Sequence, residues 1–151
     1  MRSELVHTSG PADAAAVLAE LVAFCRDEGA PCFTGWPEDL LRDYLAFHSE
    51  NGSLAFVRAP GVGRPIIGLA IGWQCHRDEL EQHWYPWNPA GDTFLFSQLV
   101  CTRPGALRSL VRNFQTRVPH WSQLRLVARR RKRGRIVTYP ARFIERLSRW
   151  M

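Results

Sequence analysis

An uninterrupted apolar run, Ile66-Ile67-Gly68-Leu69-Ala70-Ile71, most constrains what this chain can fold into. A strand with one face in water alternates apolar and polar residues, whereas a strand covered on both faces carries a continuous apolar run. We therefore predict a central strand from Pro65 to Gln74. An earlier apolar run, Ser53 to Arg58, ends at Ala59-Pro60-Gly61, and this turn signal predicts a hairpin between the two strands.

A second informative pattern lies further along the chain. An apolar stretch from Thr93 to Cys101 predicts a strand, which runs into the turn Thr102-Arg103-Pro104-Gly105. The spacing of apolar residues then predicts a helix from Ala106 to about Val118, and Gln123 to Ala128 has the composition of a short strand. A strand, a Gly-containing turn, a helix and a strand in this order predict a crossover unit inside a sheet that is otherwise antiparallel.

The remaining elements are predicted from the same kinds of signal. We expect helices from Pro11 to Glu28, from near Pro37 and from Ala141 to Trp150, a long loop from His76 to Asp92, and a last strand from Arg135 to Tyr139. The buried face of the second helix is predicted to hold Leu40, Leu41, Tyr44, Leu45 and Phe47. In the helix after Gly105 we expect Leu107, Leu110, Val111 and Phe114 to point inward and Arg108, Arg112 and Arg117 to point outward.

These elements predict an α/β (α+β) fold: a mixed, mainly antiparallel sheet flanked by helices, in a single domain over residues 1–151. Hydrophobic residues at 46% and charged residues at 23% are values typical of a globular chain. No run approaches the roughly 18 apolar residues of a membrane span, and the first ten residues do not resemble a secretory signal, so a cytoplasmic location is expected.

The four cysteines, Cys25, Cys32, Cys75 and Cys101, form no C-x-x-C pair. Zinc sites of the structural type need such pairs, and free cysteines in the cytosol are commonly buried and reduced. We therefore expect mostly buried thiols and no metal site.

Positive charge is concentrated in the C-terminal part of the sequence. The segment from Arg103 to Arg149 holds 14 of the 20 basic residues and a single acid, Glu145, so it carries +13 while the rest carries −7. Such a field favours an anionic ligand, whether a phosphate, a nucleic acid or an acidic carrier protein. Because 19 of the 20 basic residues are Arg, genomic codon bias could equally account for the excess.

The densest charge is the run Arg129-Arg130-Arg131-Lys132-Arg133-Gly134-Arg135. It has three interpretations: a solvated hairpin tip that discourages edge-to-edge aggregation, a contact for a carrier protein or a donor phosphate, or a grip on nucleic-acid phosphates. In the last case Trp121 or Tyr139 could stack on a base.

The turn at Gly105 is the best candidate for a binding site. The first backbone N–H groups of a helix have no intrahelical partner, and the helix dipole adds partial positive charge there. Gly105 permits close approach of the backbone to a ligand, and Arg103 and Arg108 can supply charged donors to a pyrophosphate or phosphopantetheine phosphate. The alternative is a tight strand-to-helix turn with solvated arginines. The residues predicted to bind the donor are Val100, Cys101, Thr102, Arg103, Gly105, Ala106, Leu107 and Arg108.

This order of strand, loop, helix and strand resembles the cofactor-binding core of the GNAT acyltransferase superfamily. From about Ala30 to Leu147 the chain is most similar to the toxin-activating lysine acyltransferases, which acylate RTX toxins from an acyl carrier protein. The similar features are Gly35-Trp36-Pro37 at a helix start, the hairpin from Ser53 to Gln74, Gly91-Asp92-Thr93 before an apolar strand, the Pro-Gly loop with the Leu107 to Phe114 helix, and the Arg125 to Arg135 region before a closing helix.

The chain departs from that family at both catalytic positions. Phe33 occupies the place of the family's His, and Ser97 or Gln98 occupies that of its Asp, so neither position supplies a base. The resemblance implies acyl transfer to an amine from acyl-CoA or an acyl carrier protein, with the catalytic residues undetermined. The alternatives are a non-catalytic module that binds nucleic acid or a protein partner through its basic half, and an inactive relative of the acyltransferases.

Other chemical patterns are weaker. His76, His83, Glu79 and Glu81 lie close in the sequence but match no metal motif, and we expect a solvated loop that could also line an acceptor cleft. Asp92, beside Gly91, is expected to be a turn residue rather than a base. Gly61-Val62-Gly63 lacks the rest of a phosphate-binding loop, and no G-x-S-x-G elbow is present.

Overall fold

The computed structural model describes residues 11–27, 33, 35–61, 64–79, 87–103, 105–118, 120–129 and 136–139. The strands are β1 (Leu54–Arg58), β2 (Ile66–Cys75), β3 (Thr93–Cys101), β4 (Arg125–Arg129) and β5 (Ile136–Tyr139). The helices are α1 (Pro11–Asp27), α2 (Glu38–Glu50) and α3 (Ala106–Arg117), with short 3-10 turns η2 (Arg77–Glu79) and η3 (Trp121–Gln123).

The five strands form one sheet in the order β1-β2-β3-β4-β5. β1 pairs with β2, β2 with β3, and β4 with β5, all antiparallel, whereas β3 and β4 are parallel. Parallel neighbours need a crossover connection, and α3 supplies it. The predicted fold class is confirmed, as is the predicted crossover within an otherwise antiparallel sheet.

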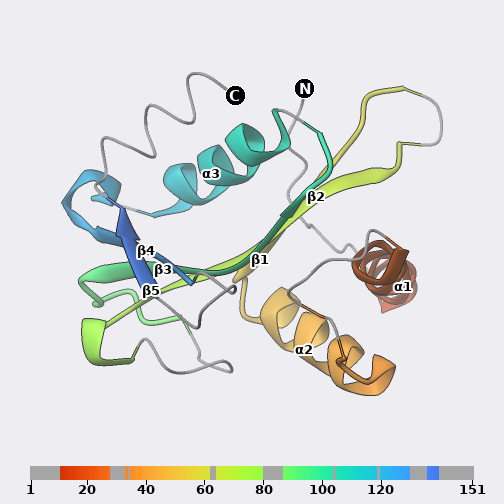
Figure 1. Cartoon of the computed structure of the whole chain (residues 1–151), viewed down its shortest axis with the longest axis horizontal. Helices are drawn as coiled ribbons and strands as arrows, with labels where there is room; N and C mark the ends of the chain where they lie inside the picture. Colours follow the sequence, from red (N-terminus) through yellow and green to blue (C-terminus); the bar gives the residue numbers. More distant parts are fainter. Residues whose placement is uncertain are drawn as a thin grey trace.

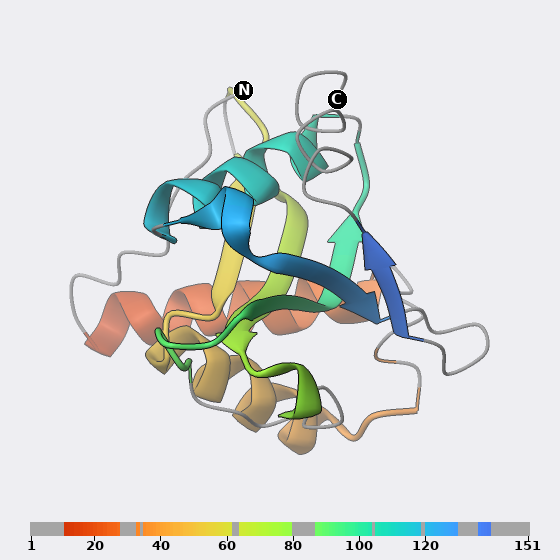
Figure 2. The same cartoon turned by 90° about the vertical axis from the view of Figure 1, so that its left-hand side faces the viewer.

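Helices cover both faces of the sheet. α3 packs on one face, and α1 and α2 lie against the other (Figures 1 and 2). β2 lies between β1 and β3 and is buried at every position, as its continuous apolar run predicts. The two faces carry different sets of core side chains.

The core on the α1 and α2 face combines aliphatic residues with aromatic rings from α1, α2, β1 and β2. Its buried members include Leu21, Cys25, Leu41, Leu45, Leu69, Ile71, Trp73, Leu95 and Val100. The core on the α3 face includes Ile67, Phe94, Phe96, Leu110, Val111, Phe114, Trp121 and Leu126. Fully burying one large apolar side chain stabilises the fold by roughly 1.5–3 kcal/mol.

The predicted buried face of α2 is correct at Leu41, Tyr44 and Leu45 but wrong at Leu40, which is 42% exposed. Phe47 is half-buried, and the residue that completes the buried face is His48. A histidine fits there because its ring stacks on Trp73 and its Nδ1 atom lies 2.7 Å from Ser53 Oγ. A buried polar group is tolerated when it has such a partner.

In α3 the predicted inward residues Leu110, Val111 and Phe114 are buried, and Leu107 is half-buried against the same core. Arg112 is exposed as predicted. The prediction for Arg117 is wrong, because its guanidinium group turns inward; Arg108 is also half-buried. The helix predicted from Ala141 to Trp150, most of the 129–135 basic run, Cys32, Glu81 and His83 lie outside the described residues.

Candidate functional site

The predicted donor loop is held in place by β2. The backbone N–H and the hydroxyl group of Thr102 both donate to the carbonyl oxygen of Ile67, at 2.9 and 3.0 Å. Next to it, a Cβ atom placed on Gly68 would lie 3.0 Å from the Cβ atom of Ala106, so this glycine lets the first turn of α3 approach β2 closely. Gly105 precedes α3 with a left-handed φ of 90°, a conformation that glycine adopts without strain.

The eight residues predicted to bind a donor differ in what they present to solvent. Cys101, Thr102 and Arg103 are exposed, and Gly105, Leu107 and Arg108 are half-buried. Val100 and Ala106 are buried in the cores on opposite faces of the sheet, so their side chains pack and only their backbone can serve a ligand. The loop is therefore a surface segment between two buried residues, Val100 and Ala106.

β3 contains a bulge that sequence patterning does not reveal. Ile71 pairs with Gln98 and Gly72 pairs with Phe96, which leaves Ser97 as an extra residue on β3. An extra residue reverses the alternation of side chains along a strand. Phe96 accordingly packs on the α3 face, whereas Gln98 faces α2 and bonds to Tyr44.

The bulge also marks where β3 stops pairing with β4. The parallel register joins Thr93 to Arg125 and ends where Phe96 pairs with Ala128. Within the described residues, 98–101 pair with β2 but not with β4. This half of β3 leads directly into the Gly105 loop, so an unpaired strand edge and a helix N-terminus lie in succession along the chain.

A cluster of buried polar side chains lies beneath α2. Tyr44 donates to Gln98 Oε1, while Gln98 Nε2, Trp73 Nε1 and Ser97 Oγ are buried with no partner among the residues that the structure describes. Ser97 and Gln98 are 2% and 3% exposed. Phe33 is also buried, in the α1 and α2 core. These positions have no titratable group.

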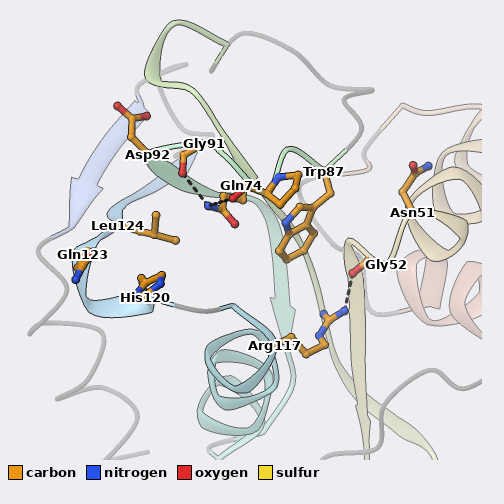
Figure 3. Close-up of a pocket in the computed structure, with 11 residues that line it drawn as sticks. Asn51, Gly52, Gln74, Trp87, Gly91, Asp92, Arg117, His120, Gln123 and Leu124 are labelled. Atoms are coloured by element: carbon orange, nitrogen blue, oxygen red, sulfur yellow. Dashed lines mark hydrogen bonds between the residues drawn. The ribbon is translucent and has the colours of Figure 1, made fainter.

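A pocket of about 670 Å³ opens at the other end of β3 (Figure 3). Its wall combines the end of α2, the end of β2, the segment before β3, the last turn of α3 and the turn before β4. The lining residues are Asn51, Gly52, Gln74, Trp87, Pro89, Gly91, Asp92, Arg117, His120, Gln123 and Leu124. No sequence pattern indicates this pocket, because five separate segments form it.

One thiol and one carboxyl group near these sites have shifted pKa values. The sulfur of Cys101 is shielded although the residue reaches the surface, and this burial raises the pKa of the thiol to about 11. At neutral pH the thiol is protonated, so Cys101 is a poor nucleophile. For Asp92, burial alone would raise the pKa, but hydrogen bonds from Thr93 and Arg77 and the charge of Arg77 outweigh it and lower the pKa.

Asp92 lies directly before β3, and its carboxylate is held by Thr93 Oγ1 at 2.9 Å and by Arg77 N at 3.2 Å. These are the bonds of a residue that caps a turn. Within the described ranges, no group of three or more His, Cys, Asp or Glu side chains is placed to hold a metal ion.

No protein-family model matches this sequence, and no curated protein is significantly similar to it. Among the described residues, no helix is both long enough and apolar enough to cross a membrane.

Proposed function

We propose that this protein binds an acyl thioester donor, acyl-CoA or an acyl carrier protein, along the second half of β3 and the Gly105 loop, and transfers the acyl group to an amine. The single observation that carries the proposal is the edge of β3 that β4 leaves unpaired after Phe96. An extended ligand can bond to an unpaired strand edge in the manner of an added strand. The pantetheine arm of both donors carries amide groups that suit such an edge.

The charged end of the donor fits the start of α3. Arg103 is exposed there, and Nε of Arg108 is shielded from solvent and has no hydrogen-bond partner in the described part of the chain. The helix dipole adds partial positive charge at this end of α3, where the N–H group of Ala106 itself donates to the carbonyl oxygen of Arg103 at 3.3 Å. These groups favour binding of the donor's phosphate at the start of α3, with the thioester lying along β3 before the Gly105 loop.

The reaction needs positioning more than it needs a strong catalytic base. The amine nitrogen attacks the thioester carbonyl carbon, the C–N bond forms, the C–S bond breaks, and the thiol leaves with a proton. Backbone N–H groups near Val100 could stabilise the negative charge on the carbonyl oxygen, and water could take the proton of the amine. We place this activity in the reducing cytosol, where a thiol such as that of Cys101 stays reduced.

Thermal unfolding with a panel of acyl-CoAs tests the proposal. A donor at about 100 times its Kd stabilises a protein by about 2.7 kcal/mol, which is a clear shift in Tm. Arg103→Glu is the informative variant, because Arg103 is exposed and the substitution avoids the backbone strain that any side chain would suffer at Gly105. Arg112→Glu, also exposed but further along α3, is the matched control.

A shift in wild-type protein and in Arg112→Glu that is lost in Arg103→Glu supports the donor site. The absence of any shift with acyl-CoA or with an acylated carrier protein removes the proposal. Binding to DNA or RNA that falls steeply with salt would instead favour the nucleic-acid alternative, which depends on the 129–135 run.

A further inference from the structure

The pocket at the far end of β3 contains a cation whose charge no described group balances. Arg117, in the last turn of α3, is half-buried, and its burial lowers the pKa of the guanidinium group. Its Nη1 atom donates to the carbonyl oxygen of Gly52 at 2.7 Å, as Figure 3 shows. Among the described side chains, no carboxylate forms an ion pair with it.

The other two guanidinium nitrogens of Arg117 are the ones that could bind a ligand. Nε and Nη2 of Arg117 are shielded from solvent and have no hydrogen-bond partner among the described residues. These two atoms form one edge of the guanidinium group, and their N–H bonds point in the same direction. That edge is the fork that binds both oxygens of a carboxylate at once.

Aromatic rings surround this fork. The guanidinium carbon lies 4.9 Å from the centre of the Phe114 ring and 5.8 Å from the centre of the Trp87 ring. Phe114 is fully buried, whereas Trp87 is half-buried and lines the pocket. Because the fork is shielded, a ligand can reach it only if a neighbouring side chain moves, and a flat ligand in the pocket could stack on the Trp87 ring.

The other charges of the wall favour a ligand with a single negative charge. Asp92 lines the pocket but is ion-paired with Arg77 at 3.4 Å, so it neither neutralises Arg117 nor is free to bind a cation. A mainly apolar wall with one guanidinium fork that has no partner among the described residues suits a monoanion with an apolar body.

We infer that this pocket binds a small organic monocarboxylate with a flat apolar body, in which both carboxylate oxygens accept hydrogen bonds from Nε and Nη2 of Arg117 and the flat body lies against Trp87. The pocket of about 670 Å³ is large enough for such a molecule. It lies at the opposite end of β3 from the Gly105 loop, so this site is separate from the proposed donor site and does not depend on it.

Isothermal titration at neutral pH with 2-naphthoate, its neutral amide 2-naphthamide and inorganic phosphate tests the inference. We expect the acid to bind saturably and the amide and phosphate to bind much more weakly. Arg117→Lys keeps the charge but removes the fork, so it should weaken naphthoate binding about tenfold or more. Arg112→Lys, an exposed position on the same helix, should leave that binding unchanged.

Two further readouts distinguish binding at Arg117 from binding elsewhere on the protein. Naphthoate should change the fluorescence of the wild-type protein, and Trp87→Phe should remove most of that change. Arg103→Glu, which tests the donor loop, should bind naphthoate normally. Equal binding of acid and amide, stronger binding of phosphate, or no binding of the acid overturns the inference even if Arg117→Lys proves unable to fold, because these comparisons use the wild-type protein.

Discussion

The hydroxyl group of Tyr44 donates a hydrogen bond to Oε1 of Gln98, and both side chains are buried. This bond joins α2 to the residue that follows the bulge in β3. The bulge turns Gln98 toward α2, and the tyrosine then satisfies one of its two polar atoms. The Tyr44–Gln98 hydrogen bond therefore holds, from the core side, the part of β3 whose edge we propose as the donor site.

Tyr44→Phe should destabilise the protein by about 1–3 kcal/mol, because it leaves Gln98 Oε1 buried without a donor. Equilibrium unfolding in urea measures the change. Gln98→Leu is the matched variant on the other side of the hydrogen bond. It removes an amide group whose Nε2 atom has no partner among the described residues, so it should lower the free energy of unfolding by less than Tyr44→Phe does. The double variant should be less destabilised than the sum of the two single variants. Additive effects would show that the bond contributes nothing.

Gly72→Ala should disturb the bulge. A Cβ atom at position 72 would lie 2.8 Å from the Phe94 ring and 2.9 Å from the carbonyl oxygen of Leu95, so the strands would have to move apart. Overpacking of this kind costs about 1–3 kcal/mol, measurable by urea unfolding. We also expect weaker binding of the acyl donor, since the neighbouring edge of β3 would shift. Wild-type stability in this variant would contradict the described register.

Cys101 should react slowly with iodoacetamide at neutral pH, because burial raises the pKa of its thiol to about 11. Peptide mass spectrometry at a series of pH values gives the alkylation rate at this one cysteine. The raised pKa also means that the associated stability is complete below the ordinary thiol pKa and is lost as the pH rises through about 11. An alkylation midpoint close to the ordinary value of 9.0 would be inconsistent with the shielded sulfur.

Asp92 should stabilise the protein at neutral pH and lose this effect in acid. Its pKa is lowered from 3.8, since the bonds to Thr93 and Arg77 outweigh the opposing effect of burial. A lowered pKa gives stability that is present above the ordinary pKa and is lost as the pH falls through the folded-state value. The Tm difference between wild type and Asp92→Asn should therefore shrink as the pH falls below 3.8. A difference that is constant with pH would argue against the ion pair.

The regular elements could be predicted because their signals are local. The bounds of β3 match the predicted strand at both ends, and α3 begins after Gly105, where the turn signal predicts its start. Leu40 and His48 depart from the predicted face of α2 because helical periodicity leaves the edge of a buried face ambiguous. The partners that bury His48 lie on β2 and on the turn between α2 and β1.

The sites depend on contacts that periodicity does not contain. The bulge at Ser97 arises from the register between two strands, which no run of apolar residues specifies. Arg117 follows the spacing of an exposed position, yet two aromatic rings and the carbonyl group of Gly52 draw it inward. Long-range packing of this kind outweighs the local preference of a charged side chain for water.

Hydrogen exchange with and without a saturating acyl-CoA would show whether the donor binds along β3. We expect slower exchange in peptides that cover residues 97–109, where the donor would bond to the edge of β3 and to the first turn of α3, with little change in peptides that cover the end of α3. Unchanged exchange over residues 97–109, or protection confined to another segment, would contradict the proposed donor site.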